Sequence, residues 1–213
     1  MTSREAWLEM KSLEVWKNEN QIFSNLSLRL NKGQNTILLG PNGSGKSAIV
    51  GLINRSIYPL HKYNSEFKLF GQREINIWNM RSKIGLISTE IDQRISDKDR
   101  VSEIVSSALY QSFSMRNKKR LNSIDKNRVA KILLEFQLSN ISEKEYRLLS
   151  DGQKRRVLIA RSIVHNPEVL VLDEPTSKLD IKSRYILEEC LESLASKGTT
   201  ILQITHDINS ITK

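Results

Sequence analysis

Apolar and polar positions along the chain follow two different periods. Short apolar or alternating runs, several of them ending at a turn residue, indicate strands over residues 15–16, 26–30, 36–39, 67–70 and 84–87. Residues 46–55 come after a glycine-rich stretch and have the spacing of a helix. The first part of the chain therefore predicts strands with a helix between them.

The middle of the chain has the period of helices. Apolar residues at 101–109 and 129–136 recur at helical spacing, and few strand signals lie between residues 89 and 149. The α/β alternation then returns, with helices expected at 150–165 and 181–196 and strands at 169–172 and 200–204. The run 169–172 is apolar throughout, as is typical of a parallel strand covered on both faces.

These elements predict one α/β domain with an insertion. The α/β core is expected to consist of residues 1–89 and 151–213, and residues 90–150 to form a helical subdomain. The chain has 213 residues, which suffice for a domain with a modest subdomain. Its 38% hydrophobic and 27% charged residues can form a core and exclude global disorder.

Composition also indicates the compartment. No apolar stretch approaches the roughly 20 residues needed to span a bilayer. The first ten residues include Arg4, Glu5 and Glu9 and have no apolar run, so they do not resemble a secretory signal. The single cysteine, Cys190, cannot form an internal disulfide, which fits a reducing compartment. We expect a cytoplasmic protein.

The formal net charge of +9 leaves several interpretations open. A nucleic acid, an acidic membrane surface or a polyphosphate ligand would each match it, and so would a lysine-rich solvated surface. The densest basic run, residues 116–120, contains no aromatic residue that could stack on a base. We interpret the run as a solvated loop and expect no nucleic-acid partner.

A phosphate-binding pattern lies between the predicted strand 36–39 and the helix that follows it. Its members are Gly40, Pro41, Asn42, Gly43, Ser44, Gly45, Lys46 and Ser47, with Ala48 next in the helix. Glycines let backbone N–H groups curl around phosphate oxygens, and the helix N-terminus favours an anion. Lys46 would supply charge to the β- and γ-phosphates, and Ser47 would bind Mg²⁺. A glycine-rich turn that binds nothing is the alternative, which the flanking strand and helix disfavour.

Two carboxylates directly follow the apolar run 169–172. In open α/β sheets, the carboxyl ends of parallel strands border the ligand crevice. We expect Asp173 to hold Mg²⁺ through water, and Glu174 to orient and polarise the attacking water. The alternative is a solvated loop with two acids, which the phosphate-binding pattern makes a poor explanation.

The motif Leu-Ser-Asp-Gly-Gln at residues 149–153 resembles the signature Leu-Ser-Gly-Gly-Gln of the ABC (ATP-binding cassette) ATPase superfamily. Residues 173–176 resemble the Walker B motif of that family and its extension, residues 177–180 resemble its D-loop, and His206 resembles its switch histidine. With the P-loop, these motifs stand in the order and spacing of the family. The resemblance covers nearly the whole chain.

The resemblance implies a site shared by two copies that bind Mg-ATP between them. The signature residues Ser150, Asp151, Gly152 and Gln153 would reach the γ-phosphate held by the opposite protomer. Their place at a helix N-terminus suits an anion. Asp180 would communicate across the interface, and His206 would contact the γ-phosphate beside Glu174. Trp16 stands where the family places an adenine-stacking aromatic residue, although a tryptophan at a strand end is also common in a core.

Two positions depart from the family pattern. Asp151 replaces a glycine of the signature, and a carboxylate pointing inward there would repel the γ-phosphate. We expect Asp151 to point away and activity to be retained. The Q-loop glutamine expected after the strand 84–87 is missing, and both Glu90 and Gln93 remain candidates for its role.

The resemblance implies a cytoplasmic ATPase subunit on the inner face of the membrane. It would act as a homodimer, or as a heterodimer with another ABC ATPase, and would power permease subunits on separate chains. A substrate-binding protein would be a further partner in an importer. The alternative is a soluble ABC ATPase acting on nucleic acid or ribosomes, but such members carry two cassettes or long coiled-coil insertions. A P-loop kinase for a small metabolite would leave the signature, the D-loop and His206 unexplained.

Overall fold

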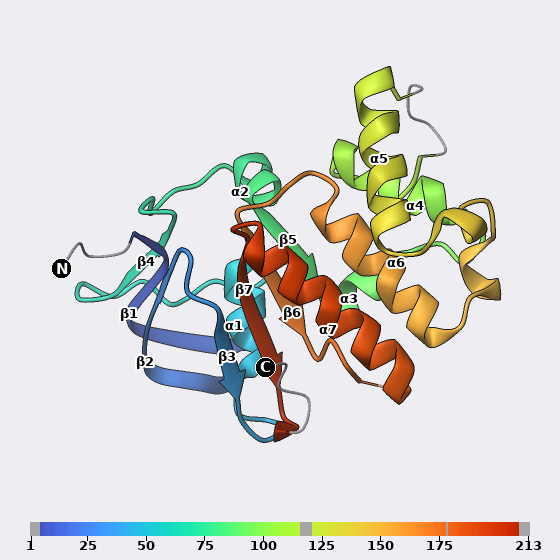
Figure 1. The fold of residues 1–213 in the computed structure, drawn as a ribbon. Helices are drawn as coiled ribbons and strands as arrows, with labels where there is room; N and C mark the ends of the chain where they lie inside the picture. The colour runs from blue at the N-terminus through green and yellow to red at the C-terminus, as the bar shows by residue number, and fades with distance from the viewer. Residues whose placement is uncertain (1–4, 116–120, 178, 209–213) are drawn as a thin grey trace.

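The computed structural model describes residues 5–115, 121–177 and 179–208 (Figure 1). The basic run 116–120 and the D-loop residue Lys178 lie outside the described residues. The strands are β1 (Ala6–Lys17), β2 (Asn20–Asn31), β3 (Thr36–Leu39), β4 (Glu66–Leu69), β5 (Ile84–Ile87), β6 (Val169–Asp173) and β7 (Thr200–Thr205). The helices are α1 (Lys46–Ile53), α2 (Ile77–Lys83), α3 (Thr89–Asp92), α4 (Val101–Ser107), α5 (Ser123–Glu135), α6 (Asp151–Ile163) and α7 (Ile181–Ser196), with 3₁₀ turns η1 (Ala108–Tyr110), η2 (Ser139–Ile141) and η3 (Tyr146–Leu148).

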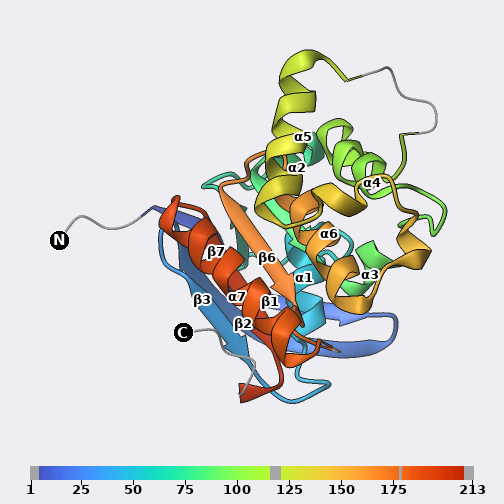
Figure 2. The ribbon, with the colours of Figure 1, turned by 45° about the vertical axis from the view of Figure 1, so that its right-hand side comes forward.

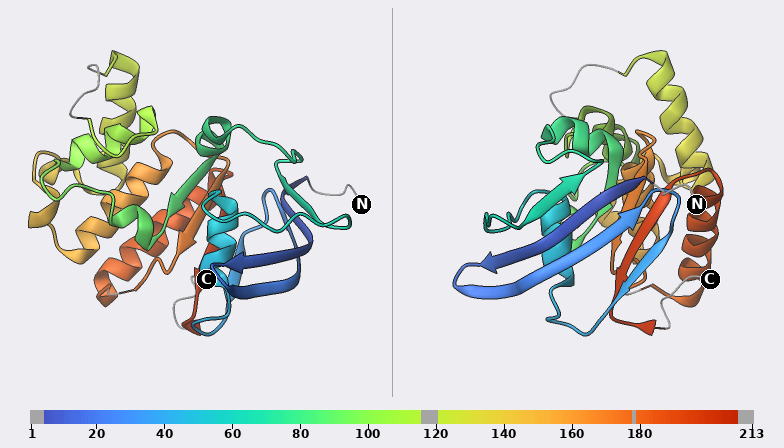
Figure 3. Two further views of the ribbon diagram at one scale, coloured as in Figure 1. Left: turned by 180° about the vertical axis from the view of Figure 1, so that it is seen from behind. Right: turned by 90° about the vertical axis from the view of Figure 1, so that its left-hand side faces the viewer.

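The central sheet is parallel, with the strand order β3-β7-β6-β5. The side chains of β6 alternate between two cores: Val169 and Val171 pack with α1, whereas Leu170 and Leu172 pack with α6 and α7. All four residues are fully buried. Figure 3 shows α1 and α7 on opposite faces of this sheet. The predicted parallel strand covered on both faces is confirmed.

A second, antiparallel sheet with the order β2-β1-β4 covers the α1 side of the molecule. The pairing of β1 with β2 runs from Ala6 opposite Asn31 to Lys17 opposite Asn20. The buried side chains of β1 join those of α1 in one core, which includes Trp7, Leu8, Val15, Leu52 and Ile53. This packing fixes the position of α1, and therefore the position of the loop that precedes it.

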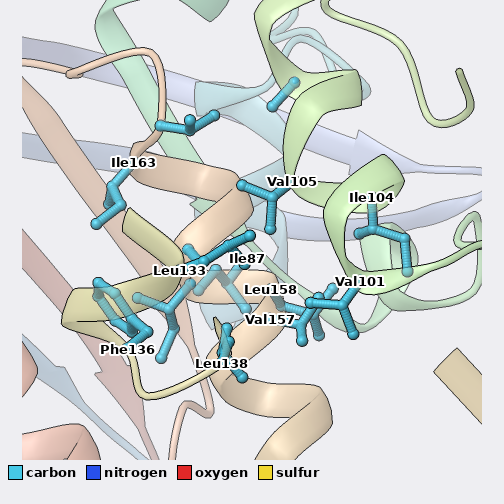
Figure 4. Close-up of a cluster of buried hydrophobic side chains, with 14 of the residues drawn as sticks. Ile87, Val101, Ile104, Val105, Leu133, Phe136, Leu138, Val157, Leu158 and Ile163 are labelled. Atoms are coloured by element: carbon cyan, nitrogen blue, oxygen red, sulfur yellow. The ribbon is translucent and has the colours of Figure 1, made fainter. Parts of the chain in front are cut away.

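The helical layer, formed by α4, α5 and α6, packs on the side of the central sheet that faces away from α1. Figure 2 shows these three helices grouped together at the upper right. Its core joins α4, α5 and α6, and the close-up in Figure 4 labels Ile87, Val101, Ile104, Val105, Leu133, Phe136, Leu138, Val157, Leu158 and Ile163. Helices α3, α4 and α5 fall within the segment predicted as the helical subdomain, apart from Thr89, the first residue of α3. Helix α6 packs on α4 and also contacts β5 and α7, so it joins the helical layer to the sheet.

Two short helices have no counterpart among the predicted elements. Helix α2 buries only Met80, so it lacks the apolar stripe by which an amphipathic helix is detected. It begins instead at a cap, because the Asn76 side chain accepts a hydrogen bond of 2.8 Å from the Trp78 N–H. Helix α3 has four residues and buries none of them. Within the described ranges, no helix has the length and apolar character needed to cross a membrane.

Close packing of α6 against β5 leads to a stability prediction. An added Cβ at Gly85 would lie 2.3 Å from the backbone carbonyl oxygen of Ser162 and 3.1 Å from Cδ1 of Leu170. The substitution Gly85→Ala must therefore move backbone, and we expect the free energy of unfolding to fall by about 1–3 kcal/mol. We expect Gly85→Ser to lower the free energy of unfolding further, because its side chain is larger. Urea denaturation measures both, and an unchanged midpoint for Gly85→Ala would show that the helix moves aside freely.

Candidate nucleotide site

The loop between β3 and α1 has the backbone of a phosphate-binding loop. Gly43 and Gly45 have φ values of 82° and 91°, which side chains other than glycine rarely adopt. Gly45 also lies against β2, because an added Cβ would be 2.3 Å from Cζ of Phe23. Gly45 caps α1, which starts at Lys46 without a side-chain cap. The free N–H groups at the start of α1 therefore remain available to an anion.

Lys46 lies within this loop. Its Nζ donates to the carbonyl oxygens of Gly40 and Pro41, at 2.6 and 2.8 Å. The Gly40 N–H donates to the Thr205 carbonyl oxygen at 3.3 Å, which ties the loop to the end of β7. The Lys46 ammonium is therefore held beside the N-terminus of α1. The positive charge of the ammonium and the helix N-terminus would both attract a polyphosphate.

A cavity of about 350 Å³ borders the loop. Its walls are formed by Lys17, Ile22, Asn42, Gly43, Gly45, Lys46, Ser47, Ala48, Ile57, Thr89, Asp173 and Glu174. The cavity thus brings together residues of the predicted P-loop and both predicted carboxylates. Sequence reasoning did not predict Lys17, Ile22 and Ile57, because their places on the wall depend on how the antiparallel sheet and α1 pack together.

The oxygen ligands on this wall fit Mg²⁺. Ser47 supplies a hydroxyl and Asp173 a carboxylate. Within the described ranges, no group of three or more His, Cys, Asp or Glu side chains could hold a metal by itself. Mg²⁺ is commonly bound by one or two protein oxygens together with substrate phosphates and water, rather than by a cage of protein ligands. The donor set matches that mode of binding.

The two carboxylates have different environments. Asp173 ends β6, and burial, followed by the neighbouring Glu174, raises its pKa, although Arg155 and Lys46 act in the opposite direction. Glu174 has a left-handed backbone with φ of 50°, and its N–H donates to the Ile204 carbonyl oxygen at 2.9 Å. The turn after β6 therefore ties the backbone of Glu174 to β7.

Glu174 and His206 contact each other directly. Glu174 Oε1 lies 2.7 Å from Nδ1 of His206, and Thr205 Oγ1 donates to Oε2 at 3.4 Å. His206 follows the last residue of β7, so the parallel pairing of β6 with β7 brings the two residues together. The contact gives Glu174 a fixed orientation at the edge of the cavity, where a carboxylate can accept a proton from water.

The signature residues form the start of α6. Ser150 caps the helix: its Oγ accepts from the Gln153 N–H at 3.3 Å, while Oε1 of Gln153 accepts from the Ser150 N–H at 3.0 Å. Gly152 is buried, since an added Cβ would lie 2.1 Å from Oγ of Ser183 in α7. Asp180 caps α7 by accepting from the Ser183 N–H at 2.7 Å. The signature and the end of the D-loop are therefore packed together.

Several predicted site residues lie outside the cavity wall. The signature residues, Asp180 and His206 are not among those lining it, and neither are Gly40, Pro41 and Ser44 of the loop. Trp16 is 42% exposed, and its Nε1 donates to Oε1 of Glu14 at 2.7 Å, so its stacking role stays a prediction. Where the Q-loop glutamine was expected, Thr89 lines the cavity. Glu90 instead faces Arg94 at 3.7 Å, and Gln93 caps the end of α3.

A family model described as ABC transporter matches residues 23–177. The chain belongs to the ABC transporter family. The phosphate import ATP-binding protein PstB of Pseudoalteromonas translucida is 29% identical, over 98% of this chain and 76% of the relative. The zinc uptake system ATP-binding protein ZurA of Listeria innocua is 31% identical, over 96% of this chain and 78% of the relative. The solved structure of cbiO1 from Clostridium perfringens, part of the transporter complex cbiONQ, has 26% identity and a TM-score of 0.81, covering 98% of this chain and 81% of that one.

The ABC cassette fold inferred from the motifs is thus confirmed, and so is the ATPase class. The chain is an ATP-binding, ATP-hydrolysing subunit of the ABC transporter type. The relatives named above favour the transport interpretation over a soluble ATPase acting on nucleic acid or ribosomes.

The departure at Asp151 generates a test. Asp151 is exposed in the first turn of α6, where a negative charge favours the helix N-terminus. We expect Asp151→Gly to lower the free energy of unfolding by about 0.5–1 kcal/mol and to change the ATPase rate by less than about threefold. Asp151→Asn is the matched control, because it removes the charge and keeps the side-chain shape. A large rate gain in both variants would show that the carboxylate inhibits hydrolysis.

Proposed function

We propose that two copies of this cassette, or this chain and a second ABC ATPase, bind Mg-ATP between them and drive a membrane permease on separate chains. The observation that carries the proposal is the division of the motifs. The P-loop, Asp173 and Glu174 share one cavity, whereas the signature stands on an exposed helix start outside it. A nucleotide in the cavity would therefore meet a signature only when a second cassette supplies one.

Several residues of the cavity have proposed roles in binding or hydrolysing ATP. The start of α1 and Lys46 bind the phosphates, and Ser47 and Asp173 hold Mg²⁺, which neutralises phosphate charge when bound. Glu174 orients the attacking water and accepts its proton, and His206 holds Glu174 at its present position. Thr89 takes the place of the Q-loop glutamine on the cavity wall. Trp16, next to the wall residue Lys17, stacks on the adenine.

A second cavity supports the permease as partner. It has a volume of about 320 Å³ and lies where α1, α2 and α3 meet α6, so both parts of the cassette contribute to it. Its lining includes Arg55, Arg81, Arg94 and Arg161, with Glu90 as its one acidic residue. A cytoplasmic segment of the permease that inserts here would contact α3 directly. The cassette would accordingly sit on the inner face of the membrane, with a substrate-binding protein as a further partner if the system imports.

Trapping the closed dimer tests the proposal. Glu174→Gln keeps the shape of the side chain and removes the base, so with Mg-ATP it should hold a dimer that does not turn over. The tagged variant is purified from its own cells in mild detergent, and bound proteins are identified by mass spectrometry. We expect a multi-spanning membrane protein in near-stoichiometric amount.

The matched control carries Lys46→Ala in addition to Glu174→Gln, and should recover neither the dimer nor the membrane protein, because it cannot hold the phosphates. Recovery of Glu174→Gln as a dimer alone, or with ribosomes or with nucleic acid in a salt-sensitive complex, would replace the transport role with a soluble one.

A further inference from the structure

A buried arginine lies beneath the turn that carries Glu174. Arg155 is in the second turn of α6 and is 9% exposed. Its Nε donates to the Pro175 carbonyl oxygen at 2.7 Å, and its Nη2 donates to the carbonyl oxygens of Asp173, at 3.2 Å, and Glu174. One side chain thus binds the carbonyls of three consecutive residues, and two of these residues carry the carboxylates of the site.

The backbone conformation of the turn needs the support that these hydrogen bonds provide. Glu174 has a left-handed backbone, which costs a residue other than glycine free energy unless its surroundings hold it. The planar guanidinium presents several N–H groups in a fixed arrangement, so it can bind adjacent carbonyls at once, whereas an ammonium is a single point of charge. Without Arg155, the backbone of the turn would lose these hydrogen bonds and could relax. The 2.7 Å contact between Glu174 and His206 would then lose its support.

The remaining nitrogen of Arg155 reaches a different element. Nη1 lies 3.6 Å from Oδ2 of Asp92, the last residue of α3. Burial lowers the pKa of Arg155, and Asp92 is the foremost influence against that change. Helix α3 begins at Thr89, which lines the nucleotide cavity. Arg155 therefore joins the signature helix, the helix after β5 and the turn after β6 at one point.

We infer that Arg155 is a positioning residue: it holds the backbone of the Glu174 turn in its hydrolytic geometry and, through Asp92, transmits the position of α3 to that turn. The inference rests on the role proposed above for Glu174. It adds a physical link by which movement of α6 or α3 would change hydrolysis through the backbone of the Glu174 turn.

The test compares binding with turnover. In Arg155→Gln we expect kcat for ATP to fall by about 10–100-fold, the size expected when charge-assisted hydrogen bonds are lost. The Kd of a fluorescent ATP analogue should stay within about twofold, because Arg155 is not on the cavity wall. Arg155→Lys keeps the charge but not the planar fork, and should recover less than about a third of the lost rate. Arg73→Gln, an exposed arginine paired with Glu66, is the matched control and should leave both values unchanged.

A second variant keeps the inference testable if Arg155→Gln does not fold. Asp92→Asn leaves the three carbonyl bonds in place and removes the ion pair with α3, so we expect kcat to fall about threefold with Kd unchanged. Thermal unfolding establishes that each variant is folded. Full kcat in Arg155→Gln or Arg155→Lys, or a loss of affinity equal to the loss of rate, would overturn the positioning role. Full kcat in Asp92→Asn would overturn the link to α3.

Glu174→Gln, measured beside these variants, separates the two proposals. If it hydrolyses ATP at the wild-type rate, the proposed role of Glu174 fails. If it is inactive while Arg155→Gln is fully active, only the inference about Arg155 fails.

Discussion

Burial of β6 on both faces is the constraint on which the site depends. Its four apolar side chains point alternately into the core with α1 and the core with α6 and α7. Burying a side chain of this size stabilises the fold by about 1.5–3 kcal/mol. Shifting the strand by one residue would put Val side chains where Leu side chains now pack, and would draw the polar residue at one end of the run into the core. The register of β6 is thus fixed from both sides, and so is the place of Asp173 and Glu174 at its end.

The same strand pairing sets the electrostatics of the cavity. β6 ends beside β7, and β7 in turn pairs with β3, which leads to the P-loop. Asp173 is partly desolvated next to another carboxylate, and Lys46 and Arg155 are the cations that offset this. Lys46 lies on the cavity wall, whereas Arg155 is buried behind the turn after β6. On the cavity wall, Lys17 and Lys46 accompany the two carboxylates, and the N-terminus of α1 adds a further partial positive charge that favours a phosphate.

The sequence predicted most elements of the core because their signals are local. The apolar run of β6, the glycines before α1 and the helix Ile181–Ser196 each follow from neighbouring residues. The short helices α2 and α3 could not be predicted in this way, because α2 buries only Met80 and α3 buries none of its residues. The Q-loop was the least predictable part, because the sequence has no glutamine in the usual place. Which of Thr89, Glu90 and Gln93 faces the cavity depends on how one turn of helix is placed after β5.

Arg155 shows why a buried charge escapes sequence reasoning. Lys154, Arg155 and Arg156 form a basic run that suggests a solvated face. Successive residues of a helix point about 100° apart, however, and the three cations enter three environments. Lys154 lies over the ring of Tyr146, Arg156 donates to the Phe136 carbonyl oxygen, and Arg155 turns into the junction with the turn after β6. Burying a guanidinium there is favourable only because three carbonyls and a carboxylate surround it. That arrangement depends on the approach of α6 to the turn after β6 and to the end of α3, both of which are distant from Arg155 in the sequence.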